Sequence, residues 1–198
     1  MRFAVLGSGS QGNGTLVAHD DTYVLVDCGF SLRETERRLL RLGVHPTQLS
    51  AILVTHEHAD HVHGVGLLSR RYNLPVYLSR GTLRGMRKPI EPAGLLAGGE
   101  QLQIGALSID VIEVAHDAQE PTQYVFSDGE RRFGLLTDLG SYCAKVLDGY
   151  RDLDALMIES NHCRDLLARG HYPAFLKQRV GGQFGHLNNH QAAYLVYE

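Results

Sequence analysis

Four residues of metal-binding types within six positions constrain this chain more than any other feature. His56, His58, Asp60 and His61 directly follow an apolar stretch at residues 51–54, which predicts a short buried strand. Imidazole nitrogens and carboxylate oxygens are the ligands that suit zinc and related divalent ions. The end of a rigid strand is also where a loop can present such side chains. A solvated, tag-like histidine run would not follow a buried strand, so the pattern predicts a metal site.

Composition and charge limit the functions open to the chain. With 198 residues, of which 43% are hydrophobic and 21% charged, residues 1–198 are expected to form a single globular domain. No apolar run approaches the roughly 20 residues that cross a bilayer, and the start is unlike a signal peptide. Three cysteines without C-x-x-C spacing favour a cytoplasmic protein. The net charge of -3 excludes a globally basic nucleic-acid binder but permits a local positive groove. Nothing in the sequence sets the oligomeric state.

Hydrophobic patterning predicts a chain of alternating strands and helices. Strands are expected at residues 2–6, 15–18, 23–26, 51–54, 75–78, 101–104, 107–115, 123–126, 132–137 and 155–158. Helices are expected at residues 31–42, 61–72, 143–149, 164–168 and 174–180. Ser31 and Glu34 form an S-x-x-E capping box at the first of these, and Gly43 ends it. These strands and helices together suggest two sheets flanked by helices, an α/β sandwich.

Residues 7–14 form a glycine-rich turn whose spacing matches the dinucleotide-binding motif G-x-G-x-x-G. That fold requires a helix directly after the glycines, and residues 15–18 leave too little room for one. Two interpretations remain open. The segment is either a tight turn that needs positive φ, or a loop whose amides and polar side chains Ser8, Ser10 and Asn13 line the mouth of a site.

The pattern H-x-H-x-D-H after an apolar strand resembles the metallo-β-lactamase superfamily, and the likeness continues along the chain. Asp27 precedes a glycine two positions on, His116 closes the strand at residues 107–115, and Asp138 closes another. The resemblance implies an αββα sandwich with two mixed sheets flanked by helices. It also implies that His116 is the third metal-binding histidine and Asp138 the bridging carboxylate. Asp27 is interpreted as orienting a ligand histidine.

Within that superfamily the chain is most similar to YycJ/WalJ-type proteins, through residues 7–13, 116–121, 159–162 and 185–189. Members resemble nucleic-acid phosphodiesterases, and the type is described as a 5′-to-3′ DNA exonuclease. The resemblance therefore implies a metal-dependent hydrolase of phosphodiester bonds, with DNA rather than RNA as its partner. Two alternatives stay open: hydrolysis of small esters, thioesters or lactams on the same site, and metal binding without catalysis.

The resemblance implies a centre of two divalent ions, zinc by default, with manganese or iron also open. Three histidines are assigned to the first ion, a histidine and an aspartate to the second, and one carboxylate to both: His56, His58 and His116; Asp60 and His61; Asp138. Two such ions can hold a hydroxide between them because metal binding lowers the pKa of water. Asp60 would also orient that hydroxide towards phosphorus.

The C-terminal end departs from the family pattern. The superfamily supplies a further metal-binding histidine from a last strand, whereas this sequence stops at Glu198. Residues 191–197 look like the first turns of a helix, with Asn188 or Asn189 as its N-cap. We therefore expect a chain truncated before its last helix and strand. His186 either replaces the missing ligand or, as we favour, donates to phosphate or the departing oxygen; a helix-capping or solvated role is equally open.

Weaker candidates for substrate contact are polar residues near these segments: Ser10, Asn13, Asn161, His162 and Asn188. For Asn161 and His162 a turn after a strand is an equal alternative. One basic stretch could line a nucleic-acid groove: Arg80, Arg84, Arg87 and Lys88. A second is more simply the solvated face of the first helix: Arg33, Arg37, Arg38 and Arg41. No aromatic-rich stretch indicates a base-stacking platform.

Overall fold

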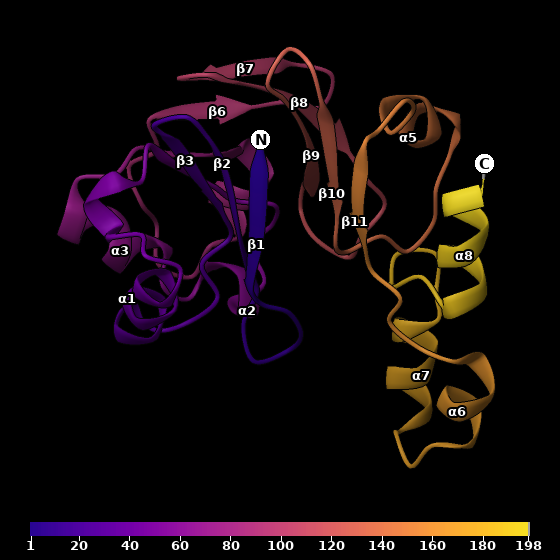
Figure 1. The fold of residues 1–198 in the computed structure, drawn as a ribbon. Coiled ribbons are helices and arrows are strands. Elements are labelled where there is room, and N and C mark those ends of the chain that lie inside the picture. Colours follow the sequence, from indigo (N-terminus) through magenta and orange to yellow (C-terminus); the bar gives the residue numbers. More distant parts are fainter. Residues whose placement is uncertain (198) are drawn as a thin grey trace.

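The computed structural model describes residues 1–197, which form two stacked mixed sheets (Figure 1). The first sheet has the spatial order β1 (Arg2–Gly7), β2 (Gly14–His19), β3 (Thr22–Val26), β4 (Ala51–Leu53), β5 (Val76–Ser79) and β6 (Gly94–Leu96). The second has the order β11 (Ala155–Ile158), β10 (Arg132–Leu136), β9 (Thr122–Ser127), β8 (Leu107–Glu113) and β7 (Gln101–Ile104). The neighbouring strands β3, β4, β5 and β6 pair in parallel, as do β10 and β11. The remaining pairs are antiparallel.

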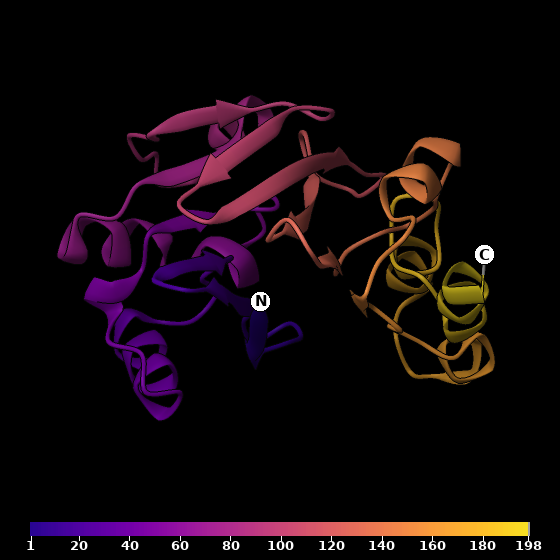
Figure 2. The same ribbon diagram turned by 45° about the horizontal axis from the view of Figure 1, so that its top comes forward.

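Helices lie on the outer side of each sheet, as Figure 1 and Figure 2 show. The first half of the chain contains α1 (Leu32–Arg41), the 3-10 turn η1 (Pro46–Gln48), α2 (Ala59–Val62), α3 (Val65–Tyr72) and α4 (Arg80–Gly85). The second half contains α5 (Ala144–Gly149), α6 (Arg164–Arg169), α7 (Ala174–Val180) and α8 (Asn189–Tyr197). Among the described residues, no helix is long and apolar enough to cross a membrane.

Strand β3 shows why the chain folds into layers. Val24 and Val26 point into the core between the two sheets, whereas Leu25 points into the outer core with Leu39 of α1 and Leu68 of α3. Successive side chains of a strand face opposite sides, so a strand covered on both faces must be apolar throughout. This pattern makes the first sheet an inner layer.

The second sheet is covered in the same way by the C-terminal half of the chain. Val146 of α5 and Leu195 of α8 share a core with Val125 and Leu136, which lie on β9 and β10. The layers are therefore helix, sheet, sheet and helix, and the αββα fold class expected from the sequence is confirmed.

Helix α1 begins and ends where the sequence predicts. The Ser31 side chain accepts a hydrogen bond from the Glu34 N–H at 3.3 Å, which satisfies one free amide of the first turn. The Glu34 carboxylate does not complete the capping box, because it accepts hydrogen bonds from Arg37 and Arg38 instead. Gly43 follows the helix with a φ of 73°, a left-handed conformation that glycine adopts without strain.

The structure differs from the sequence prediction at residues 61–72, where one helix was expected. Two helices, α2 and α3, are separated at Gly64, whose N–H donates to the Cys28 carbonyl at 2.7 Å. A side chain at Gly64 would collide with Cys28 and with the Phe30 carbonyl, so this close approach requires glycine. Helix α4 and strand β6 were not predicted, because elements of six and three residues are too short to show periodicity.

Candidate metal centre

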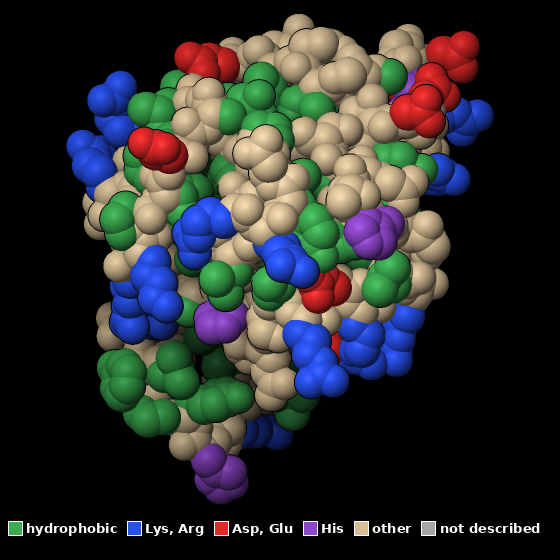
Figure 3. All heavy atoms as spheres, turned by 90° about the vertical axis from the view of Figure 1, so that its left-hand side faces the viewer, with side chains coloured by type: hydrophobic (Ala, Val, Ile, Leu, Met, Phe, Trp, Pro, Cys, Tyr) green, Lys and Arg blue, Asp and Glu red, His purple; other side chains and the backbone are tan. Residues whose placement is uncertain are grey.

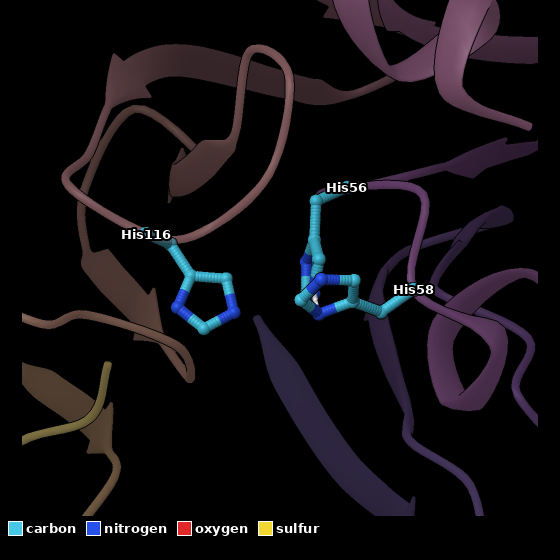
Figure 4. A group of neighbouring side chains, drawn as sticks. All are labelled: His56, His58 and His116. Atoms are coloured by element: carbon cyan, nitrogen blue, oxygen red, sulfur yellow. Dashed lines mark hydrogen bonds between the residues drawn. The ribbon is translucent and has the colours of Figure 1, made fainter. Parts of the chain in front are cut away.

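The ends of strands from both sheets bring the predicted residues together. The chain leaves β4 towards His56 and His58, leaves β8 towards His116, and leaves β10 towards Asp138. Figure 4 shows His56 and His58 on one loop, with His116 reaching towards them from the opposite loop. Three groups have ligand atoms within 4.8 Å of one another: His56, His58 and His116; His56, His61 and Asp138; His116, Asp138 and His186.

The hydrogen bonds of His116 fix which ring nitrogen carries the proton. Its Nδ1 lies 3.0 Å from the carbonyl oxygen of Gly185 and must donate, because a carbonyl can only accept. Nε2 is therefore unprotonated, and this buried atom has no hydrogen-bond partner among residues 1–197. Burial also lowers the pKa of His116 to about 4, which keeps the ring neutral. A buried acceptor without a donor is costly, and a metal cation would satisfy it.

The same reasoning applies to His56 and His58. The Thr55 hydroxyl donates to Asp27 at 2.8 Å, so it accepts from Nδ1 of His56 at 3.0 Å. Nε2 of His58 donates to the Asp117 carbonyl at 3.2 Å. In these tautomers the remaining nitrogens, Nε2 of His56 and Nδ1 of His58, both carry lone pairs, and they lie 2.9 Å apart. Two facing lone pairs repel each other unless a cation lies beside both. The donor set thus fits a metal ion.

His61 and Asp138 form a second, charged part of the cluster. Nδ1 of His61 donates to Asp27 at 2.8 Å, and Nε2 lies 3.3 Å from Asp138. Burial lowers the pKa of His61, but the charges of Asp27 and Asp138 outweigh it and raise the pKa to about 9. Burial raises the pKa of Asp138 to about 7, although the charge of His61 opposes this. Asp138 belongs to two of the three groups, so its carboxylate lies between them.

Asp60 lies at the edge of the cluster rather than inside it. Its Oδ2 is 3.7 Å from Nε2 of His61 and accepts from the side-chain amide of Asn13 at 3.2 Å. Asp60 is not a member of the three groups of ligand atoms. It lines a pocket together with His58, Asp138 and His186, so it faces the space where a substrate would enter.

The glycine-rich loop at residues 7–14 combines both interpretations left open by the sequence. Strand β2 follows it directly, with no helix in which a dinucleotide phosphate could be bound. Gly9 and Gly12 have φ values of 114° and 146°, so the turn does need glycine. The side-chain oxygen of Asn13 accepts from the Gly9 N–H at 2.8 Å while its amide faces Asp60. The loop is thus a tight turn that also lines the site.

Glu159 holds His186 in place, a role that was not predicted from the sequence. One carboxylate oxygen accepts from Nδ1 of His186 at 2.9 Å, and the other accepts from the N–H groups of Leu139 and Leu187 at 2.8 and 3.0 Å. Burial lowers the pKa of His186, but the hydrogen bond to Glu159 outweighs it and leaves the pKa above its usual value. A sequence signal existed: Glu159 follows β11 directly, as Asp138 closely follows the parallel neighbour β10.

Asp117 and Arg179 were also missed. Nε of Arg179 donates to the Asp117 carboxylate, whose other oxygen lies 3.3 Å from Nε2 of His116. Arg179 lines the same pocket as His58 and Asp60, although it comes from α7. Asp117 is next to a predicted ligand and could have been considered. Arg179 lies within a helix far along the chain, and no local pattern marks it.

The weaker candidates separate into three cases. Ser10 and Asn161 line a pocket with Asp138. His162 lies instead near Gly181 at the end of α7. Asn188 is buried, and its side chain accepts from the N–H groups of His190 and Gln191, both at 3.0 Å. The N-cap hypothesis for Asn188 is confirmed. This weakens its assignment to substrate contact, because the side-chain oxygen is already used in the cap.

The two basic stretches predicted from the sequence lie among acidic and apolar side chains on the surface. Arg33, Arg37 and Arg41 of α1 are exposed, as predicted for a solvated helix face, whereas Arg38 is half-buried over the Phe30 ring. Figure 3 shows the face that bears α1 and α3, where Lys and Arg side chains lie at several separate places among apolar ones. Helix α4 is attached near the candidate centre through the Gly81 N–H, which donates to Glu120 at 2.6 Å.

Comparison with known proteins gives matches over nearly the whole chain. A family described as "Beta-lactamase superfamily domain" matches residues 22–197. The chain is 35% identical to exodeoxyribonuclease YycJ of Bacillus anthracis, covering 98% of this chain and 75% of that protein. It is 33% identical to exodeoxyribonuclease WalJ of Streptococcus pneumoniae, covering 97% and 74%. The crystal structure of the metallo-β-lactamase fold protein YhfI from Bacillus subtilis has a TM-score of 0.76 at 20% identity, covering 98% and 80%.

Proposed function

The chain belongs to the metallo-β-lactamase superfamily, and we propose that it is a metal-dependent phosphodiesterase that degrades DNA from the 5′ end. One observation carries the proposal: His56, His58 and His116 direct unprotonated nitrogens towards one another beside Asp138. The substrate is supported by two relatives named exodeoxyribonucleases, at 35% and 33% identity.

We assign the first divalent ion to Nε2 of His56, Nδ1 of His58 and Nε2 of His116. The second would be held by His61 together with Asp60, and Asp138 would serve both ions. Zinc suits this set of nitrogen and oxygen donors, and manganese or iron would also be accepted. Such ions supply Lewis acidity that lowers the pKa of water and offsets charge on phosphoryl oxygens.

The protein side chains then have separate tasks. Asp60, at the pocket wall, orients the attacking water and accepts its proton. His186 lies across the pocket with Nδ1 engaged by Glu159, so its Nε2 is left to face the substrate and to donate to the departing oxygen. Arg179 contacts a non-bridging phosphate oxygen from the open side. Asn13 keeps Asp60 in place through its side-chain amide.

Metal analysis combined with digestion of 5′-labelled single- and double-stranded DNA and RNA tests the proposal. We expect two ions per chain and degradation of DNA from the 5′ end, abolished in Asp60→Ala. Asp21→Ala is the matched control, because Asp21 is an exposed carboxylate in the turn between β2 and β3. Two ions without cleavage of any nucleic acid would instead favour small esters, thioesters or lactams. Carefully prepared protein without metal would refute the proposal.

A further inference from the structure

A helical arm projects from the molecule beside the candidate centre. It consists of residues 163–184, containing α6 and α7, and we call it the α6–α7 arm. Figure 1 and Figure 2 show it at one end of the molecule, beyond the second sheet and away from α1 and α3. The arm begins after the turn that follows β11 and ends just before Gly185, whose carbonyl holds His116. Its base is thus part of the site.

The α6–α7 arm exposes three aromatic rings. Tyr172 and Phe184 are each 60% exposed and Phe175 is 72% exposed, which is unusual for rings in a folded protein. They lie close together in the sequence, although other residue types separate them, and the sequence alone did not show that they are exposed. The structure places all three on one projecting element. Exposed apolar groups that gather in this way mark an interaction surface.

Phe175 and Arg179 connect the α6–α7 arm to the pocket. They are four residues apart on α7, so they lie on the same face, about 6 Å apart along the axis. Arg179 lines the pocket and pairs with Asp117 beside the histidine cluster. Tyr172 lies just before the helix, in the direction away from the site. The chain thus passes from Tyr172 through Phe175 to Arg179, which reaches the pocket.

The charge of the arm distinguishes among possible partners. Residues 163–184 contain four Lys or Arg and one Asp, whereas the whole chain has a net charge of -3. Within the described residues 1–197, Arg164 and Arg169 form no ion pair. Such unpaired cations are complementary to the negatively charged phosphates of a polynucleotide. Aromatic rings interspersed with cations are the features that bind single-stranded nucleic acid, by stacking on bases and attracting phosphates.

We propose that the α6–α7 arm binds an unpaired strand of the polynucleotide and directs its end into the site. Tyr172 and Phe175 stack on successive bases, and Arg179 contacts the phosphate nearest the metal centre. A duplex offers no free base faces along its length, so the arm selects single-stranded segments or frayed ends. The proposal rests on the proposed nuclease function for its biological meaning, but strand binding can be measured without cleavage.

Fluorescence anisotropy with a labelled, nuclease-resistant phosphorothioate oligonucleotide tests strand binding in the full metal-loaded chain. We expect Phe175→Ala and Phe175→Leu to weaken single-strand binding roughly 5- to 150-fold, the range for loss of one stacked base. Phe175→Trp should keep the affinity, because it keeps a ring. Tyr197→Ala is the control, because Tyr197 is 90% exposed on α8 outside the arm. Duplex of the same sequence should bind more weakly and respond less to Phe175→Ala.

A second readout separates this proposal from the nuclease proposal. Hydrolysis of bis(p-nitrophenyl) phosphate, which is too small to reach the α6–α7 arm, should be unchanged in Phe175→Ala. Wild-type affinity of Phe175→Ala for single strands would overturn the arm proposal, even if DNA is degraded. A loss of self-association in that variant, with strand binding intact, would also overturn it and indicate an interface between two copies. Strand binding by wild type without any cleavage would refute the nuclease proposal alone.

Discussion

Replacing Asp27 by asparagine should weaken the binding of one metal ion in a chain that still folds. Asp27 is buried and accepts hydrogen bonds from the Thr55 N–H, the Thr55 hydroxyl and Nδ1 of His61, at 2.9, 2.8 and 2.8 Å. Its φ is 60°, in the left-handed region that asparagine also tolerates. Asp27→Asn therefore keeps the volume and the backbone conformation. One acceptor oxygen is replaced by an NH₂ group that can only donate.

The expected loss of metal affinity follows from which ring nitrogen of His61 carries the proton. In Asp27→Asn, the side-chain oxygen that remains would still accept from the Thr55 N–H, which places the new NH₂ group opposite Nδ1 of His61. Nδ1 must then accept, so the neutral ring carries its proton on Nε2, the nitrogen that faces Asp138. A protonated Nε2 cannot bind a cation. Removal of a residue that orients a ligand typically costs 10- to 100-fold in metal affinity, about 1.4–2.7 kcal/mol.

The assay is metal content, measured by mass spectrometry after dialysis against a series of buffered free-zinc concentrations. The weaker of two binding steps should shift roughly 10- to 100-fold in Asp27→Asn, while the urea unfolding of metal-free protein should show a loss of about 1–3 kcal/mol at most. Asp152→Asn is the matched control, because Asp152 also has positive φ and lies outside the site. Zinc uptake by Asp27→Asn with the wild-type affinity would refute the tautomer argument.

Three further predictions concern residues around the centre and the first helix. Glu159→Gln should lower the rate of DNA cleavage and shift its pH profile, since His186 loses the charge that raises its pKa, whereas metal content should change little. Tyr124→Phe should cost about 1 kcal/mol in urea unfolding, because the buried hydroxyl donates to the Val54 carbonyl at 2.7 Å. Arg37 and Arg38 hold the pKa of Glu34 at about 2, so its stabilising contribution is present above about pH 4.3 and is lost as pH falls towards 2. The Tm difference between wild type and Glu34→Gln should accordingly shrink on acidification; a constant difference would contradict this.

The sequence predicted the layers of the fold better than its short elements. Alternating and continuous apolar runs identify strands such as β3 and β9 because burial on one or two faces leaves a direct trace in the sequence. Helix α4 leaves no such trace. It is six residues long, and its position depends on Ser79, which caps the Thr82 N–H at 3.0 Å, and on the contact between Gly81 and Glu120. Contacts of that kind are tertiary and cannot be read locally.

Residues of the candidate site also divide into those that the local sequence predicts and those that only tertiary contacts define. His56, His58 and His61 are close in sequence, so any fold that places them in one loop brings them together. Glu159 and Arg179 depend on the register of β11 and the direction of α7, which only the folded chain defines. The resemblance to a known family supplied His116 and Asp138, which lie in separate loops. It included Glu159 in a matching segment but gave it no role, because that role rests on three hydrogen bonds made after folding.

One buried carboxylate sets the proton positions of half the cluster, and this links the fold to the chemistry. Asp27 accepts from Thr55, Thr55 accepts from His56, and Asp27 also accepts from His61. The step through Thr55 leaves a lone pair on Nε2 of His56, whereas the hydrogen bond to Asp27 orients His61 and raises its pKa; both steps begin at the end of β3. The other half is set by backbone carbonyls of Gly185 and Asp117. Because folding itself buries the groups that direct these donors, the chain orients His56, His58 and His116 for a cation before any cation is bound, whereas His61, whose pKa is raised to about 9, must first release a proton.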